Sequence, residues 1–375
     1  MPIRVALIIP TLDRSGAEKQ LTLLATGLPR DEFEVHVALL TRGGPYEADL
    51  RAAGIPVTEF RKRGKCDPVA WSRLRRWLRD VQPEVIHTWL FAANAYGRLA
   101  ARVVPEASVI VSERCVDSWK AGWQHWLDRK LLPATDRVVG NSQSVVDFYR
   151  ERGVPGEKLV CIPNGIEAPA APRVTRAELL LQLGFPDDAF VIVYVGRLAA
   201  QKRVEDLIWS TELLRQVRPQ LRLVLVGDGP ARETLERLTR DVHSQDNVRF
   251  VGNQERAADW LQMADAFCLA SSFEGMSNSL MEAMAAGKPC IASDIPANRE
   301  LIEQGRTGFL APLKDTMAIA QFVRRLIDEP GLGATLGVAA RQKMQDEFSV
   351  PQMCERYAAL YREAVARHSL PAGVS

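Results

Sequence analysis

Residues 266–289 read AFCLASSFEGMSNSLMEAMAAGKP, and this stretch decides the fold class. The apolar run 266–270 predicts a buried strand, since short apolar runs bounded by turn residues are typical of strands covered on both faces. A polar loop containing Gly275 follows, and a helix begins near Ser277–Ser279 and continues to about residue 286. The stretch is therefore one strand–loop–helix unit, from which α/β proteins are built.

The same alternation of strand and helix extends in both directions from this unit. In the second half of the chain, strands are predicted over 190–195, 221–226, 248–251, 266–270 and 290–293, and helices over 204–216, 231–242, 256–263 and 279–286. In the first half, strands are predicted over 4–9, 33–40, 57–60, 85–88, 109–112, 137–140 and 160–163, and helices over 17–28, 47–53, 68–80, 92–102 and 142–152. Such alternation builds parallel sheets with helices on both faces.

The chain is too long for one core of ordinary size, and it divides at a stretch without periodicity. Residues 163–172, PNGIEAPAAP, are interpreted as a linker between two domains. The predicted domains are residues 1–165 and 175–348, followed by a helix over 350–367. The predicted fold class is α/β, with two Rossmann-like domains whose parallel sheets face each other across a cleft. Ligands then lie beyond the carboxyl ends of the strands.

The composition excludes several classes of protein. The 375 residues are 47% hydrophobic and 25% charged with a formal net charge of +2, which is ordinary for a globular enzyme and gives no global field for nucleic acid. Six scattered cysteines without a Cys-x-x-Cys pair argue against a zinc site and a disulfide framework. The apolar run 5–9 is too short for a signal peptide, and no run approaches the roughly 18 apolar residues of a membrane span. We therefore expect a reduced, cytoplasmic protein.

The loop after the quoted strand carries the strongest functional signal. The first amides of a new helix lack partners within the helix and favour an anion, and Gly275 allows close approach to the backbone, so a diphosphate or sugar hydroxyls could dock there. Glu274 and Glu282 are eight residues apart, roughly 12 Å along a helix, so that one carboxylate could meet a sugar and the other a ribose. For a bare pair of glutamates a surface role is the commoner interpretation, and the neighbouring Ser277 and Asn278 weigh against it.

Two further loops that follow predicted strands offer groups for binding phosphate. Gly196 ends the first strand of the second half, and Arg197 and Lys202 follow it. An arginine fork and a lysine point charge can stabilise the charge on a departing diphosphate. Gly16 opens the helix after the first strand of the chain, where amides could face a phosphate, and Gly229 belongs to a tight turn lining the cleft. Taken alone, two such cations are more often solvated residues of a loop, and a lone glycine at a helix start is more often a simple turn. The position of Arg197 and Lys202 after the first strand of the second half favours function.

A tryptophan-rich segment over 119–130 contains Trp119, Trp123 and Trp126 beside Lys120, Arg129 and Lys130. A basic, aromatic helix of this kind can touch a membrane surface or a lipid-linked acceptor. A half-buried amphipathic helix is the favoured interpretation, and it applies with more force to Trp71 and Trp77, which lie among four arginines.

Together these motifs resemble glycosyltransferase family 4, the retaining family with the GT-B fold. The resemblance extends from about Val5 to about Phe348. Its most specific part is the Glu-x7-Glu motif from Glu274 to Glu282. The supporting parts, in the family's order and spacing, are Gly196-Arg197…Lys202, residues 223–230, Asn141-Ser142 and residues 162–165.

The resemblance implies a role for each matching position. Glu274 would lie by the donor sugar, Arg197 and Lys202 would bind the diphosphate as the other catalytic residues, and Glu282 would hold the ribose. The remaining donor-binding positions would be Gly16, Gly196, Gly229, Gly275, Met276, Ser277, Asn278, Ser279 and Leu280. The C-terminal helix would cross back to pack on the first domain. No metal or other cofactor is implied, because the helix N-terminus and the two cations neutralise the charge, and retention would proceed by front-face attack.

The chain departs from the family pattern at three positions. A serine precedes Gly16 where members often have a second glycine, and an arginine follows Lys202 where glycine is common. Many members have a histidine after the strand that here ends just before Glu113 and Arg114. Glu113, Arg114 and Asn141 are therefore the candidates for a contact with the acceptor or the sugar.

The resulting prediction is a metal-independent, retaining glycosyltransferase of the hexosyltransferase type, active in polysaccharide biosynthesis. Its partners would be a UDP- or GDP-sugar donor and a glycan or lipid-linked acceptor, without nucleic acid, with peripheral contact at the inner face of a membrane left open. One alternative is a nucleotide-sugar epimerase, for which we would expect extra carboxylates and histidines near the sugar. The chain has only five histidines, and none of them lies in these loops. Another is a non-catalytic binding protein, which would need no Glu274. A nicotinamide dehydrogenase is disfavoured because no complete Gly-x-Gly-x-x-Gly fingerprint follows the first strand of either half.

Overall fold

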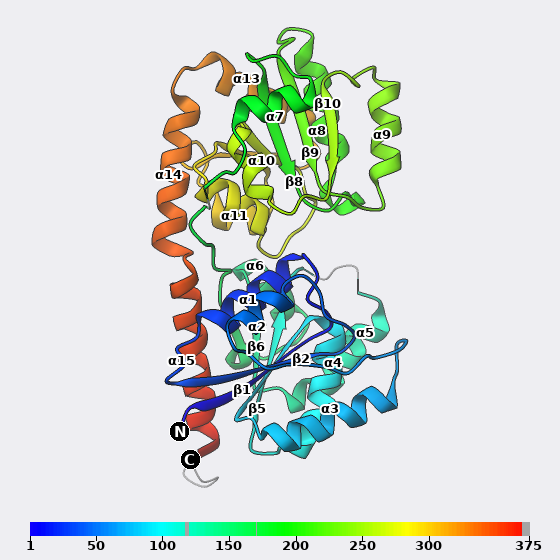
Figure 1. Ribbon diagram of the computed structural model, residues 1–375, viewed down its shortest axis with the longest axis vertical. Coiled ribbons are helices and arrows are strands. Elements are labelled where there is room, and N and C mark those ends of the chain that lie inside the picture. The colour runs from blue at the N-terminus through cyan, green and yellow to red at the C-terminus, as the bar shows by residue number, and fades with distance from the viewer. Residues whose placement is uncertain (117–119, 170, 370–375) are drawn as a thin grey trace. The chain divides into compact units, whose positions relative to one another are not determined.

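The structure is a computed structural model that describes residues 1–116, 120–169 and 171–369. The chain divides into two compact units, each an α/β sheet covered by helices (Figure 1). Unit 1 comprises Met1–Gly165 and Val350–Ser375, and unit 2 comprises Ile166–Ser349. Both sheets are parallel, which confirms the predicted fold class.

The sheet of unit 1 has seven strands in the order β3-β2-β1-β4-β5-β6-β7. The strand order reverses between β1 and β4, so the sheet is doubly wound, and its ligand-binding edge is the one at the carboxyl ends of these strands. The strands are β1 (Ile3–Ile9), β2 (Phe33–Leu39), β3 (Val57–Glu59), β4 (Val85–Trp89), β5 (Ser108–Glu113), β6 (Arg137–Gly140) and β7 (Leu159–Cys161).

Helices cover both faces of this sheet, and the last of them comes from the far end of the chain. They are α1 (Gly16–Gly27), α2 (Glu47–Ala52), α3 (Pro68–Val81), α4 (Leu90–Ala100), α5 (Gly122–Leu131), α6 (Gln143–Glu151) and α15 (Val350–Ser369). Helix α15 packs against α1, β4 and β5. Its Tyr361 hydroxyl lies 2.6 Å from Nδ1 of the fully buried His87, whose Nε2 lies 2.8 Å from the Ser112 hydroxyl. The C-terminal helix is therefore part of the core of unit 1.

The sheet of unit 2 has six strands in the order β10-β9-β8-β11-β12-β13. They are β8 (Phe190–Val195), β9 (Leu221–Val226), β10 (Val248–Gly252), β11 (Ala266–Leu269), β12 (Cys290–Ser293) and β13 (Phe309–Ala311). The helices are α7 (Arg176–Leu183), α8 (Val204–Arg215), α9 (Arg232–Asp241), α10 (Ala257–Met263), α11 (Asn278–Ala285), α12 (Pro296–Leu301), α13 (Thr316–Asp328) and α14 (Leu332–Glu347). The strand order reverses between β8 and β11, which makes them the centre of this sheet.

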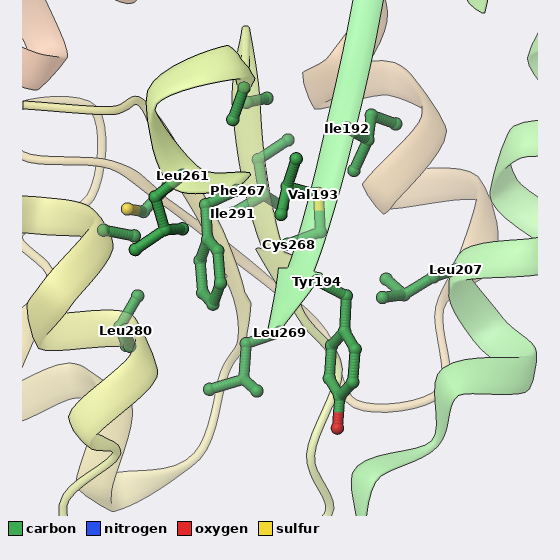
Figure 2. Packing of buried hydrophobic residues seen from close by; sticks show 14 of the residues in the cluster. Ile192, Val193, Tyr194, Leu207, Leu261, Phe267, Cys268, Leu269, Leu280 and Ile291 are labelled. Atoms are coloured by element: carbon green, nitrogen blue, oxygen red, sulfur yellow. The ribbon is translucent and has the colours of Figure 1, made fainter. Parts of the chain in front are cut away.

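The core of unit 2 forms around these two central strands. Figure 2 shows Val193 of β8 and Phe267 of β11 among the apolar side chains, all of them buried. Tyr194 is also fully buried, and its hydroxyl points past the carboxyl end of β8. Strands of β-branched and aromatic residues that are buried on both faces fit a parallel sheet between two helical layers.

Most predicted elements agree with the structure to within a few residues, and the differences are local. Strand β13 and helices α7, α12, α13 and α14 were not predicted individually. The stretch interpreted as a linker begins as packed structure, because Asn164, Gly165 and Ile166 are buried. Trp119 lies outside the described residues. Among the helices that the structure describes, none is both long and apolar enough to cross a membrane.

Candidate active site

Three loops of unit 2 meet at the carboxyl edge of its sheet. They follow the neighbouring strands β9, β8 and β11 and comprise residues 227–230, 196–202 and 270–277. All three strands run parallel, so their loops share one edge. The topology thus gathers the three unit 2 segments that the sequence singled out.

Glycines allow the first two of these loops to pack directly on each other. The Leu198 N–H donates to the Asp228 carbonyl at 2.9 Å. A Cβ at Gly229 would lie 2.3 Å from the Leu198 carbonyl oxygen. A Cβ at Gly227 would lie 2.0 Å from the Gly196 carbonyl oxygen, and Gly227 has a φ of +134°. Only glycine fits at such close backbone approaches.

The second and third loops are joined by three polar contacts. Nζ of Lys202 lies 2.5 Å from Oε1 of Glu274. The Gln201 side chain donates to the Phe273 carbonyl at 2.7 Å, and the Ser272 N–H donates to the Gln201 carbonyl at 2.8 Å. The structure therefore brings together two of the three predicted catalytic residues, and it holds them in a defined position.

The Lys202–Glu274 pair is largely withdrawn from water. The Glu274 side chain is 8% exposed and that of Lys202 is 19% exposed. A partly buried ion pair of this kind requires its partner, because removing one charge leaves the other desolvated. Burial raises the pKa of Tyr194, and the negative charge of Glu274 contributes to the same shift. The tyrosine hydroxyl donates to the Arg197 carbonyl at 2.9 Å, so it fixes the backbone at the second cation.

Arg197, the third predicted catalytic residue, differs from Lys202 in its surroundings. It is exposed, and among the described residues its guanidinium has no hydrogen-bond or ion-pair partner. Its backbone is anchored through Tyr194 while its side chain can reorient. A guanidinium in this situation can bind a phosphate without first breaking a protein contact.

Helix α11 begins where the third loop ends. Ser277 is its N-cap, and the Ser277 hydroxyl accepts from the Leu280 N–H. Gly275 and Met276 are buried in the loop, and Asn278 and Ser279 form the first turn, whose amides point toward the loop. The predicted donor-binding positions from 275 to 280 are therefore consecutive around one helix N-terminus, which carries a partial positive charge. Glu282 lies one turn further along the same helix, and its side chain is partly exposed.

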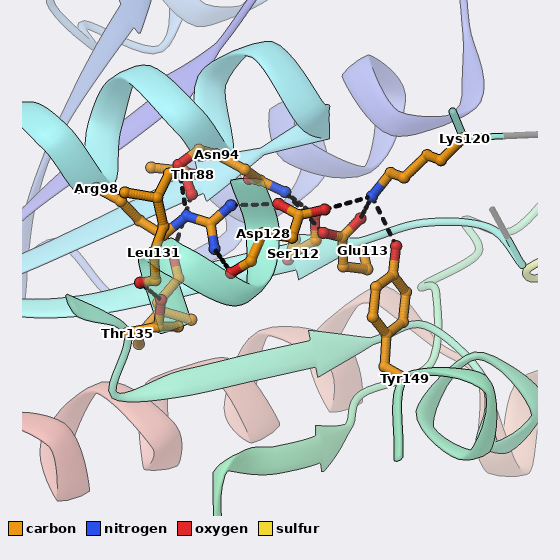
Figure 3. A network of polar contacts seen from close by, with 11 residues as sticks. Thr88, Asn94, Arg98, Ser112, Glu113, Lys120, Asp128, Leu131, Thr135 and Tyr149 are labelled. Carbon is orange, nitrogen blue, oxygen red and sulfur yellow. Dashed lines mark hydrogen bonds and ion pairs between the residues drawn. The ribbon is translucent and has the colours of Figure 1, made fainter. Parts of the chain in front are cut away.

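The remaining predicted residues belong to unit 1. Gly16 is the first residue of α1 and is exposed. Glu113, at the end of β5, is buried in an ion-pair network that Figure 3 shows. Its carboxylate lies 3.2 Å from the buried Lys120 ammonium, which also contacts Asp128 at 3.2 Å and the Tyr149 hydroxyl at 2.8 Å. Glu113 therefore serves the packing of α5 and α6 in this structure.

Arg114 and Asn141 lie close together beyond the ends of β5 and β6. The Arg114 guanidinium stacks on the Trp89 ring at 4.6 Å and donates to the Asn164 side chain. Asn141 donates to the Arg114 carbonyl at 3.4 Å, while its own Oδ1 has no partner among the described residues. Burial lowers the pKa of Arg114. Asn164 was not predicted as a site residue, although it lies within residues 162–165, which resemble the family.

Tyr194 and Gln201 were also not predicted, although both hold the unit 2 loops. The signal for Gln201 was its position between Arg197 and Lys202, and the signal for Tyr194 was a residue with a hydroxyl group at the last but one position of a buried strand. No group of three or more His, Cys, Asp or Glu that could hold a metal ion occurs in the part of the chain that the structure describes.

Comparisons with known proteins cover nearly the whole chain. A family model described as Glycosyltransferase Family 4 matches residues 14–168, and one described as Glycosyl transferases group 1 matches residues 176–343. The chain is 29% identical over 353 residues to the lipopolysaccharide core biosynthesis glycosyltransferase LpsD of Rhizobium meliloti, which is 94% of this chain and 96% of that protein. It is 30% identical over 303 residues to the glycogen synthase of Mycobacterium tuberculosis, which is 76% of this chain and 70% of that protein.

Among solved structures, Anabaena Alr3699/HepE superposes with a TM-score of 0.85 at 21% identity, over 96% of this chain and 100% of that one. Its structures were determined in complex with UDP and with UDP-glucose. At this level of identity, the likeness extends to the fold.

Proposed function

The chain belongs to glycosyltransferase family 4 and is a glycosyltransferase that uses a nucleotide-sugar donor, and from this premise we propose that it is a metal-independent, retaining hexosyltransferase acting from a UDP- or GDP-sugar. The observation that carries the assignment of the site is the Lys202–Glu274 pair, which lies beside the N-terminus of α11 at the edge of the central strands. The complexes of Anabaena Alr3699/HepE with UDP and UDP-glucose support a uridine nucleotide.

The residue roles follow from charge and placement. Arg197 and the first amides of α11 bind the diphosphate, and Lys202 neutralises the charge that develops on it as the glycosidic bond breaks. A carboxylate accepts hydrogen bonds only, so Glu274 binds hydroxyl groups of the donor sugar while Glu282 binds those of the ribose. The departing phosphate accepts the proton of the incoming hydroxyl, so no carboxylate nucleophile is needed, in contrast to retaining glycosidases.

We propose a glycan or lipid-linked acceptor, bound by unit 1 near Arg114 and Asn141. The loops after β5 and β6 meet there, and Asn141 offers a buried oxygen that has no partner in the described structure. The name of the Rhizobium relative, a lipopolysaccharide core glycosyltransferase, supports an acceptor of this class. The described cysteines are all free, which is consistent with a cytoplasmic protein that acts at the inner face of a membrane.

A thermal-shift screen against UDP, GDP, ADP and their sugars, with a chelator present, tests the donor class. A ligand at a hundredfold excess over its Kd stabilises the folded state by about 2.7 kcal/mol. We expect one nucleotide family to raise the Tm, equally with and without the chelator. A shift that requires a divalent metal would contradict metal independence, and the absence of any shift would contradict the site.

Retention is tested by the configuration of the product. With an α-linked donor and the acceptor identified by screening, the proton coupling constant of the new anomeric centre should be that of an α-glycoside. A β-linked product would show that the enzyme inverts.

A further inference from the structure

Positive charge is concentrated in unit 1 between residues 61 and 79, here called the basic segment. It contains eight Lys and Arg residues and one acidic residue, Asp67, in a chain whose formal net charge is only +2. The segment comprises an exposed loop and most of α3. Such a local excess is a property of one surface and not of the whole protein.

Most of these cations face solvent without a neutralising partner. Within the described residues, five exposed cations have no ion pair: Arg63, Lys65, Arg73, Arg76 and Arg79. The Asp67 carboxylate accepts from the N–H groups of Arg63, Val69 and Ala70 and caps α3, and these hydrogen bonds lower its pKa. The only carboxylate of the basic segment therefore binds backbone N–H groups and not the side chains of these cations.

Helix α5 exposes two tryptophans. The Trp123 and Trp126 residues are 55% and 61% exposed, and Lys130 lies over the Trp126 ring at 6.0 Å. Positions 123, 126 and 130 recur at helical spacing, so they form one face of α5. Large exposed aromatic side chains beside cations are typical of surfaces that meet the headgroup region of a bilayer.

Helix α4 connects the basic segment to α5, because α3 and α5 both pack against it (Figure 1). On one side, the Tyr96 hydroxyl accepts from the Asp67 N–H at 2.6 Å, and the Lys62 ammonium lies 5.3 Å from the centre of its ring. On the other side, the rings of Phe91 and Trp123 contact edge to face at 5.6 Å. The cations and the tryptophans thus belong to one helical layer of unit 1.

We propose that this layer, the basic segment together with the Trp123–Trp126 face of α5, docks onto a membrane surface containing anionic phospholipids. The exposed cations complement lipid phosphates, and the two indole rings enter the interface. This inference rests on the proposed function, since a lipid-linked acceptor is the reason for an enzyme to sit at a bilayer. Nucleic acid is the less favoured occupant, because the charge is local and the aromatic rings lie on a separate helix from most of the cations.

Flotation of the full-length protein with vesicles tests the proposal. We expect binding to phosphatidylcholine vesicles that contain phosphatidylglycerol, little binding to phosphatidylcholine alone, and partial release in high salt. The variant Lys65→Gln/Arg76→Gln should lower the partition coefficient about 25-fold, because each cation near an anionic surface contributes about fivefold. Trp126→Ser should weaken binding that remains in high salt. The matched controls, Arg237→Gln/Arg240→Gln and Trp209→Ser, replace exposed residues of unit 2 and should bind like the wild type.

Several results would overturn the inference. They are equal binding to both kinds of vesicle, no binding at all, equal losses in the control variants, tighter binding to a DNA duplex than to the anionic vesicles, or a dimer that the Lys65 and Trp126 variants dissociate. Nucleotide thermal shifts on the same samples separate this inference from the proposed function. If the wild-type protein is stabilised by a nucleotide but does not bind vesicles, only the docking inference is refuted. If it binds vesicles but no nucleotide, only the donor site is refuted.

Discussion

Lys202 and Glu274 are 72 residues apart in the chain, yet their side chains form one ion pair. The sequence places both residues in loops that follow predicted strands. The resemblance to the family implies that both lie at the donor site. It does not predict that they touch, because contact depends on β8 and β11 being neighbours while β9 and β10 lie elsewhere. Strand order is a property of the folded sheet, and no local pattern in either loop encodes it.

Glu113 illustrates the opposite situation at the same scale. Its position after a strand makes it a candidate for a contact with sugar or acceptor, and its residue type is suitable. In the structure its carboxylate is taken up by Lys120 and Asn94. Lys120 is seven residues further along the chain. Its burial depends on how α5 packs, which sequence periodicity does not specify.

The two glutamates of the Glu-x7-Glu motif should differ in their effect on kinetics. Glu274→Ala should lower kcat on the order of 100-fold with little change in donor affinity, because hydrogen bonds to the reacting sugar strengthen in the transition state. Glu282→Ala should instead weaken donor binding by about 1.5–3 kcal/mol, the value of a hydrogen bond to a charged group. Steady-state kinetics together with calorimetric donor titration measure both, and equal losses of both quantities in each variant would contradict the separate roles.

Arg197→Ala should cost about 2–4 kcal/mol in kcat/KM while leaving the Tm unchanged. The reason is that its guanidinium has no protein partner in the described structure, so its removal breaks no contact of the fold. Arg237→Ala, an exposed arginine of the same unit, is the control. Wild-type kcat/KM in Arg197→Ala would remove this residue from the site.

At the scale of elements, the carboxyl edge of the unit 2 sheet is a set of three loops that hold one another. The strands and the helix starts that flank them were predictable, since apolar runs ending in Gly or Ser mark them clearly. Helices α13 and α14 were missed because they follow the last recognised strand, where no strand–helix alternation remained to guide the interpretation. The close packing of Gly229 on Leu198 could not be predicted from the sequence either, because glycine occurs in turns for several different reasons.

Gly229→Ala should destabilise unit 2 by about 1–3 kcal/mol and reduce the nucleotide thermal shift, because the new methyl group meets the Leu198 carbonyl at 2.3 Å and forces the loops apart. Gly333→Ala is the matched control in α14. Its new methyl group would lie 3.4 Å from Pro289, an ordinary contact, so that this variant should be neutral or slightly stabilised. Urea titrations of both variants measure the difference, and similar free energies of unfolding would refute the close approach.

At the scale of the whole molecule, His87 joins β4 to the C-terminal helix in the core of unit 1. Burial holds its pKa well below the ordinary value of 6.5, and the nearby positive charge of Arg114 acts in the same direction. Near pH 6.5 the His87 imidazole therefore binds a proton in the unfolded chain, whereas in the folded chain it stays neutral. The stability contributed by this neutral histidine is complete above pH 6.5 and is lost as the pH falls.

The free energy of unfolding of unit 1 should accordingly decrease below pH 6.5, by up to about 1.4 kcal/mol for each pH unit. His87→Gln should be less stable at neutral pH and should lack this part of the pH dependence, which the difference between the two proteins isolates from other titrating groups. His243→Asn, at an exposed position, should retain the wild-type slope. Parallel pH profiles for wild type and His87→Gln would contradict the assignment.

The return of α15 to unit 1 also bears on how the protein is made. Unit 2 is inserted within unit 1, and its two ends are adjacent, since the Ile166 N–H donates to the Phe348 carbonyl at 2.7 Å. During synthesis, every strand of both sheets leaves the ribosome before the helix that carries Tyr361. The strands of unit 1 are thus translated first, but part of the core of unit 1 stays uncovered until α15 follows the whole of unit 2. A ribosome that pauses before the codons for α15 would expose all of unit 2 but only part of unit 1, whereas domains usually fold in N-to-C order.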